Sequence, residues 1–136
     1  MLIFGALIPL NATQEGAQGG GTPLRSVEYL ELSEAMQGQD LDSALTLGQR
    51  AMETLTASDS VGVKTRVLNN LGDIYLTKAD FDMALDFFLQ AKKNNEILME
   101  SDPENQSLWL VEAGIHVRIG ILHFRLHDYE SSLIDY

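Results

Sequence analysis

The 136-residue sequence lacks cysteine and has few basic residues, and each shortage excludes a class of function. Without cysteine there is no disulfide framework, no thiolate metal site and no thiol nucleophile. Nine Lys and Arg against 20 Asp and Glu give a formal net charge of −11, which repels nucleic-acid phosphates. The apolar run Leu2 to Leu10 is too short to span a bilayer. We therefore expect no nucleic-acid binding, and membrane contact only through sequence outside this chain.

The first 12 residues have the pattern of the end of a secretory signal peptide. The apolar run leads into Leu10-Asn11-Ala12, which fits a small-residue cleavage site after Ala12. No Lys or Arg precedes Arg25, so this interpretation expects Met1 to lie inside a longer signal whose charged start is upstream. This interpretation predicts a periplasmic or otherwise exported protein. In the alternative, the run is an apolar tail on a cytoplasmic protein. Residues 13-21 are glycine-rich and polar, which predicts a flexible linker.

From Thr22 onward the sequence predicts helices throughout. No segment alternates with period two for long enough to indicate a strand. Five residues have the side chains preferred at helix N-caps: Thr22, Asp40, Ser60, Asp80 and Asp102. The expected helices span about 23-38, 41-57, 61-78, 81-100, 103-126 and 129 to the end. Short links between them make successive helices antiparallel, so 22-136 is expected to be one all-α domain.

The segment 65-98 carries a spaced set of apolar and small residues: Leu68, Leu71, Gly72, Tyr75, Phe81, Ala84, Phe88 and Ala91. This set resembles the signature of the tetratricopeptide repeat, although Leu68 stands in place of the opening Trp and Glu96 in place of the closing Pro. The resemblance implies helix-turn-helix units stacked into a right-handed α-solenoid. A weaker copy begins at Ala113, where Ile119-Gly120 matches Leu71-Gly72. Another weak copy lies upstream at 25-58, where Leu32 stands at the glycine position.

The units are therefore expected at about 25-58, 65-98 and 113-136. Ala84 follows Ala44 by 40 residues and Ser132 follows Ala84 by 48, so the repeats are longer than the usual 34 residues. Gly72 and Ala84 are expected to let two helices touch backbone to backbone. Because the last helix stops without a capping turn, we expect the third unit to be truncated and the array to continue beyond Tyr136.

No catalytic arrangement is found in the sequence. The segment "GAQGGG" follows no strand and lacks the lysine of a phosphate loop, so we expect neither an enzyme nor a cofactor. His123 and His127 lie one helical turn apart, a spacing compatible with zinc, and His116 precedes them. His123 and His116 also take the positions of a packed tyrosine and of Leu68. We favour the interpretation as core histidines, and no metal site is predicted.

The resemblance implies a binding groove lined by the first helix of each unit. The groove positions are Arg66, Asn69, Asn70, Asp73 and Thr77 in one unit, and Val117, Arg118, Ile121 and Arg125 in the next. Leu76 and Phe124 lie among them. The three arginines favour an extended or helical peptide of acidic character. Alternatively, they only balance nearby acidic groups.

We therefore expect a protein- or peptide-binding module. Export and tandem repeats are similar to the extracytoplasmic sensing or scaffold part of bacterial signalling proteins such as sensor histidine kinases. The alternative is an intracellular adaptor or regulator that binds a peptide in its groove.

Overall fold

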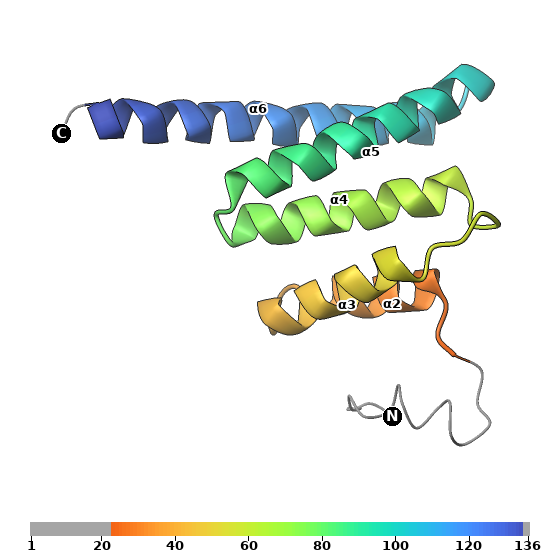
Figure 1. Cartoon of the computed structure of the whole chain (residues 1–136). Coiled ribbons are helices and arrows are strands. Elements are labelled where there is room, and N and C mark those ends of the chain that lie inside the picture. Colours follow the sequence, from red (N-terminus) through yellow and green to blue (C-terminus); the bar gives the residue numbers. More distant parts are fainter. Residues whose placement is uncertain (1–22, 135–136) are drawn as a thin grey trace.

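The structure, a computed structural model, describes residues 23–134 and contains five helices in this range. They are α2 (Ser26–Met36), α3 (Leu41–Glu53), α4 (Val61–Thr77), α5 (Phe81–Ser101) and α6 (Gln106–Ile134). Residues 23–134 contain no strand, which confirms the all-α class. In Figure 1 the helices stack in chain order, from α2 and α3 at the bottom to α6 at the top. The expected signal segment 1-12 and linker 13-21 lie outside the described residues.

Three of the predicted N-caps are confirmed. The carboxylate of Asp40 accepts a hydrogen bond from the Ser43 N–H at 3.2 Å, and Asp80 accepts one from Met83 at 3.3 Å. Ser60 accepts from the Val63 N–H at 3.1 Å. Each bond satisfies an amide that has no partner within the helix. The Ser43 hydroxyl also donates to Asp40, and these bonds to the carboxylate lower its pKa.

The two starts predicted next to proline are wrong by three residues. α2 begins at Ser26, where the Glu28 carboxylate reaches back to accept from the Arg25 N–H at 2.7 Å. This hydrogen bond is the main reason why the pKa of Glu28 is lowered. α6 begins at Gln106, because Asp102 ends α5 and Asn105 accepts from the Ser107 N–H.

The break predicted between residues 126 and 129 is also wrong, because α6 continues through it as a single 29-residue helix. At the corresponding place in the preceding hairpin, Ala79 adopts the left-handed φ of 63° that reverses the chain. Leu126-His127-Asp128, by contrast, stays in the helical conformation. The hairpin expected in the third unit is therefore not formed, and the C-terminal part of α6 projects beyond the α4–α5 hairpin (Figure 1).

The core consists of two apolar clusters that meet at α4. One is formed by α2, α3 and α4, and its buried members are Tyr29, Leu30, Ala51, Val67 and Leu71. The other is formed by α4, α5 and α6, and its buried members are Leu68, Ala84, Phe88, Ala91, Ile115 and Leu122. α4 thus buries opposite faces against two neighbours, as an interior helix of a stack must. None of the described helices combines the length and apolar character needed to cross a membrane.

Gly72 makes room for an aromatic ring. A Cβ placed on Gly72 would lie 2.6 to 2.8 Å from three ring atoms of Phe88, which is fully buried. The expectation of a backbone-to-backbone contact at Gly72 therefore needs correction: α5 approaches α4 there through the Phe88 ring. Tyr75 and Phe87 stack next to this contact, with ring centroids 5.6 Å apart. Tyr75 and Phe81 are half-buried, whereas Ala84 and Ala91 are fully buried.

In the first hairpin, the small residue at the helix contact is Ser33, one position after Leu32. Ser33 is buried and donates a 2.6 Å hydrogen bond to the Ala44 carbonyl, whereas Leu32 is exposed. On α3, a Cβ on Gly48 would lie 3.0 Å from Leu71 and 3.2 Å from the Ser33 hydroxyl. Gly48 is not among the residues expected at the helix contact, because the repeat signature has its glycine in the first helix of the unit.

Candidate protein-interaction surface

The α4 half of the predicted groove is engaged in bonds within the chain. Arg66 forms a 2.7 Å ion pair with Glu34 of α2. Asn70 is buried, donates to the Ser33 hydroxyl at 2.8 Å and accepts from Gln37. The Thr77 hydroxyl donates to the Asp73 carbonyl, and Oδ1 of Asn69 is buried with no partner among the described residues. Arg66 and Asn70 thus connect α4 to α2, and a ligand that used them would have to displace those contacts.

Arg118 connects α6 to α4. Its Nε and Nη2 donate to the two carboxylate oxygens of Asp73 at 2.6 and 3.2 Å. Its guanidinium carbon also lies 5.9 Å from the centre of the Phe88 ring. Asp73 thus neutralises Arg118, and Glu34 neutralises Arg66. Both are among the three arginines that favoured an acidic peptide. Only Arg125 of the three has no ion-pair partner among the described residues, and its side chain is exposed.

The α6 half of the groove is open and apolar. Val117 is 62% exposed and Ile121 is 41% exposed, and on the same side of the helix Leu110 is 74% and Phe124 65% exposed. Leu110, Val117 and Phe124 recur every seven residues, so they form one stripe along the helix. Ala113 and Gly120 lie between them and are also exposed. We call the surface formed by Leu110, Ala113, Val117, Gly120, Ile121 and Phe124 the α6 outer face.

Gly120 is uncovered, unlike Gly72. A Cβ placed on Gly120 would meet nothing within 4 Å apart from its own helix backbone. The two glycines belong to the matching pairs Leu71-Gly72 and Ile119-Gly120. In α4 this glycine is covered by the aromatic ring of an antiparallel helix, whereas in α6 no described residue covers it.

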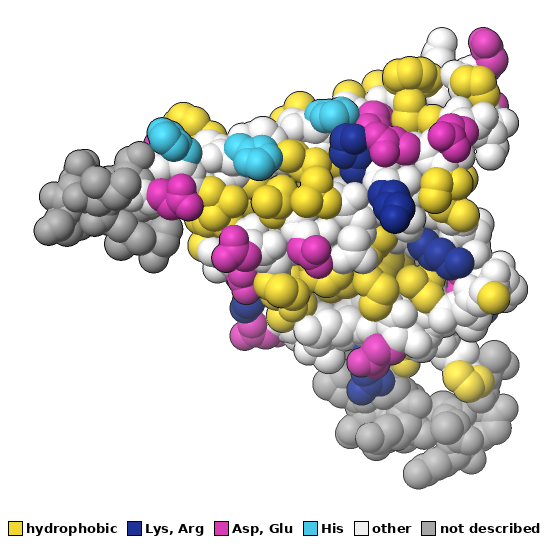
Figure 2. Space-filling model, turned by 45° about the horizontal axis from the view of Figure 1, so that its top comes forward, with side chains coloured by type: hydrophobic (Ala, Val, Ile, Leu, Met, Phe, Trp, Pro, Cys, Tyr) yellow, Lys and Arg dark blue, Asp and Glu magenta, His cyan; other side chains and the backbone are white. Residues whose placement is uncertain are grey.

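The histidines border the α6 outer face. His116, His123 and His127 are all exposed, so the expectation that they pack in the core is wrong. Figure 2 shows the three histidine side chains in a row along α6, with hydrophobic side chains on both sides of the row. From Ala113 to His127 the helix contains no Asp or Glu. In a chain of net charge −11, this is a long stretch of surface helix without a carboxylate.

A polar cluster holds the other side of α6 against α5. Asn95 is buried and donates to the Glu112 carboxylate and to the Leu108 carbonyl, each at 3.0 Å. His116 approaches the other oxygen of Glu112 at 3.1 Å. Lys92 binds Glu96, and this hydrogen bond raises the pKa of Lys92. Among the described residues no three potential ligands are placed to hold a metal ion. The cluster fixes the α5–α6 pair and leaves the α6 outer face free.

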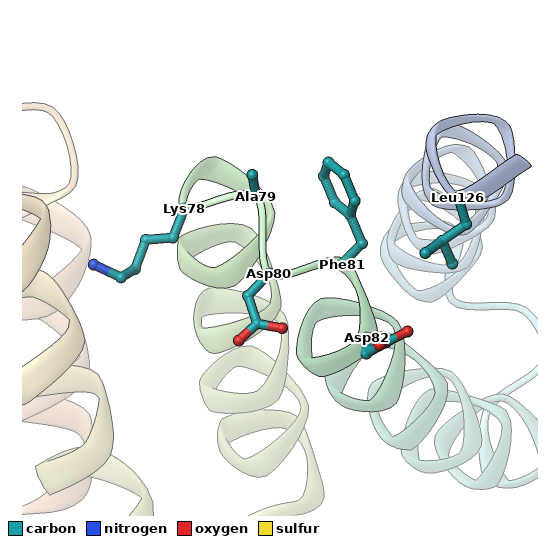
Figure 3. A pocket seen from close by; sticks show the side chains of 6 residues that line it. All are labelled: Lys78, Ala79, Asp80, Phe81, Asp82 and Leu126. Carbon is teal, nitrogen blue, oxygen red and sulfur yellow. The ribbon is translucent and has the colours of Figure 1, made fainter. Parts of the chain in front are cut away.

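Two hollows adjoin α6, and neither has the features of a ligand site. One, of about 540 Å³, lies between the α4–α5 turn and α6 and is shown in Figure 3. In that view Lys78 extends away from Leu126 of α6, and its ammonium binds Asp42 of α3 at 2.9 Å. The Asp80 carboxylate is used as the α5 cap. The second hollow, of about 520 Å³, is lined partly by Glu96, Glu100 and Glu112. Both are open notches at the ends of helices.

Comparison of the chain with profiles of known protein families, with curated proteins and with solved structures finds no match.

Proposed function

We propose that this chain is a protein-binding helical-repeat module whose binding surface is centred on the α6 outer face. The observation that carries the proposal is the exposure of four large apolar side chains in one stripe on one helix. Scattered exposed apolar residues are ordinary, but a contiguous apolar stripe on a soluble protein marks an interaction site. Burying it is favourable by about 25 cal/mol for each Å² removed from water.

The geometry moves the expected contact from the arginines to the apolar residues. Of the groove positions implied by the repeat resemblance, Val117 and Ile121 are exposed and apolar, whereas Arg66 and Arg118 are paired with carboxylates. A partner helix with an apolar ridge suits such a surface better than an extended acidic peptide. The interpretation of the hairpins as units of a longer right-handed solenoid stays a prediction and supports a scaffold role.

The proposed function fits two cellular locations of the protein. In one it is the extracytoplasmic sensing or scaffold part of a larger signalling protein, which requires export directed by the segment around Leu2 to Leu10. In the other it is a cytoplasmic adaptor. N-terminal sequencing of the protein recovered from cell fractions separates the two, because export removes residues 1-12 and a cytoplasmic adaptor retains them.

Site-specific photo-crosslinking tests the binding function. A photoreactive phenylalanine analogue replaces Val117 on the α6 outer face or, as the control, Leu89, an exposed residue of α5. We expect a discrete crosslinked product from position 117 in the cells that make the protein, and none from position 89. The crosslinked partner, once identified and purified, should bind the unmodified chain and should lose affinity for Phe124→Glu. No product at position 117, or equal products at both positions, would remove the proposal.

A further inference from the structure

We propose that the partner of the α6 outer face is a second copy of this chain, with the two α6 helices packed antiparallel. The inference rests on the proposed function, because it assigns an occupant to the same surface. The α4–α5 hairpin shows what covers such a face. There an antiparallel helix places the Phe88 ring over Gly72. α6 has the uncovered glycine, Gly120, and an exposed aromatic ring on the same face, Phe124.

The Phe124 ring can cover Gly120 only when the two residues belong to different copies of the chain. Gly120 and Phe124 lie four residues apart on one helix, so the ring cannot reach its own glycine. In an antiparallel pair, Phe124 of one copy lies over Gly120 of the other, and the reverse contact forms by symmetry. The two-fold axis then passes close to residue 122. Val117 and Ile121 flank this contact in both copies and lie opposite His127 and His123 of the second copy.

Charge favours this face over the rest of the surface. Two copies with a net charge of −11 each repel, but the stretch from Ala113 to His127 brings no carboxylate into the contact. The antiparallel register places Asp128 of the second copy opposite His116, which lies at the edge of the face. Both side chains are exposed in the single chain. The acidic residues of α2 and α3 remain at the far end of the stack (Figure 1).

The available area sets the expected affinity. If each large side chain of the α6 outer face contributes on the order of 100 Å², the two outer faces and the residues that border them bury roughly 1,000 Å² in total. This is the lower limit for a specific interface, and we expect a dissociation constant of about 1 to 100 μM.

Analytical ultracentrifugation of the full chain tests the proposal. We expect a monomer–dimer equilibrium that Phe124→Ala and Gly120→Ala each weaken at least about tenfold. Gly120→Ala should act because its methyl group would meet the ring of the second copy, as a Cβ on Gly72 meets Phe88. Leu89→Ala, a change at an exposed apolar residue of α5, is the control and should leave the equilibrium unchanged. Circular dichroism must show that all three variants retain the helical fold.

Spin labelling tests the orientation, and the absence of cysteine makes the labelling specific. A nitroxide at Ser107→Cys lies 15 residues from the two-fold axis, so the antiparallel pair separates the two labels by about 45 Å along the helix. A parallel pair would hold them about 10 Å apart. A short distance, a chain that stays monomeric up to about 1 mM, or a dimer that tolerates both substitutions would overturn the inference. If position 117 then crosslinks to a different protein, the proposed function survives without it.

Discussion

The α4–α5 hairpin and α6 contain the same local pattern, a large aliphatic residue followed by glycine, in two different environments. At Leu71-Gly72 the second helix folds back and fills the space over the glycine with Phe88. At Ile119-Gly120 the chain continues as a straight helix, and the space over the glycine stays open. A glycine at this position therefore indicates where another helix can approach, and the neighbouring chain determines whether one does.

The reversal of the chain depends on few residues. Lys78-Ala79-Asp80 provides a left-handed residue and then the capping carboxylate of α5. Leu126-His127-Asp128 also offers an aspartate, but no residue before it leaves the helical conformation. Asp80 and Asp128 thus have equal capping ability, and only Asp80 caps a helix. The contrast between a closed and an open glycine face leads to three predictions, of which the first has the largest effect.

Phe88→Ala should lower the free energy of unfolding by about 3–5 kcal/mol, because it removes a fully buried ring and leaves a cavity over Gly72. Phe124→Ala should change it by less than about 0.5 kcal/mol in the monomer, because that ring is 65% exposed. Urea unfolding followed by circular dichroism at low protein concentration measures both. Comparable losses in the two variants would mean that Phe124 is already covered within the single chain.

Alanine at the two glycines should act in opposite directions. At Gly72 the overpacking against Phe88 costs about 1–3 kcal/mol and the helix propensity of alanine returns about 1 kcal/mol, so the net change is a loss of up to about 2 kcal/mol. At Gly120 only the propensity acts, which gives a gain of up to about 1 kcal/mol. Thermal unfolding of the dilute monomers compares the two variants. A loss at Gly120 as large as that at Gly72 would contradict an open face.

The sequence predicted those features that depend on short stretches of chain. Asp40, Ser60 and Asp80 cap helices because each interaction spans three residues. The buried positions Leu68, Leu71 and Phe88 follow from helical periodicity. A packing face and an interaction face have the same periodicity, so the sequence could not distinguish the buried face of α6 from its outer face.

Features that join distant segments were not predictable in the same way. Arg66 and Arg118 were expected to recognise a ligand, but their carboxylate partners lie 32 and 45 residues away along the chain. Ser33 and Gly48 do not fit the repeat signature, because the small residue is one position later in α2 and on the opposite helix in α3. The continuity of α6 was missed because a capping aspartate indicates a helix start only after the preceding helix has ended.

The prediction with the smallest expected effect concerns the ion pair of Asp73 with Arg118, which links the α4–α5 hairpin to α6. A double-mutant cycle with Asp73→Ala and Arg118→Ala should give a coupling energy of about 0.5–1 kcal/mol, because the ion pair is bidentate but partly exposed. Arg66 and Glu34 form the matched control. That pair makes one contact, its side chains are 49% and 39% exposed, and its coupling should be smaller. Both couplings should fall as salt is added. A larger coupling at Arg66 would contradict the expectation that the two hydrogen bonds of Arg118 make its ion pair the stronger of the two.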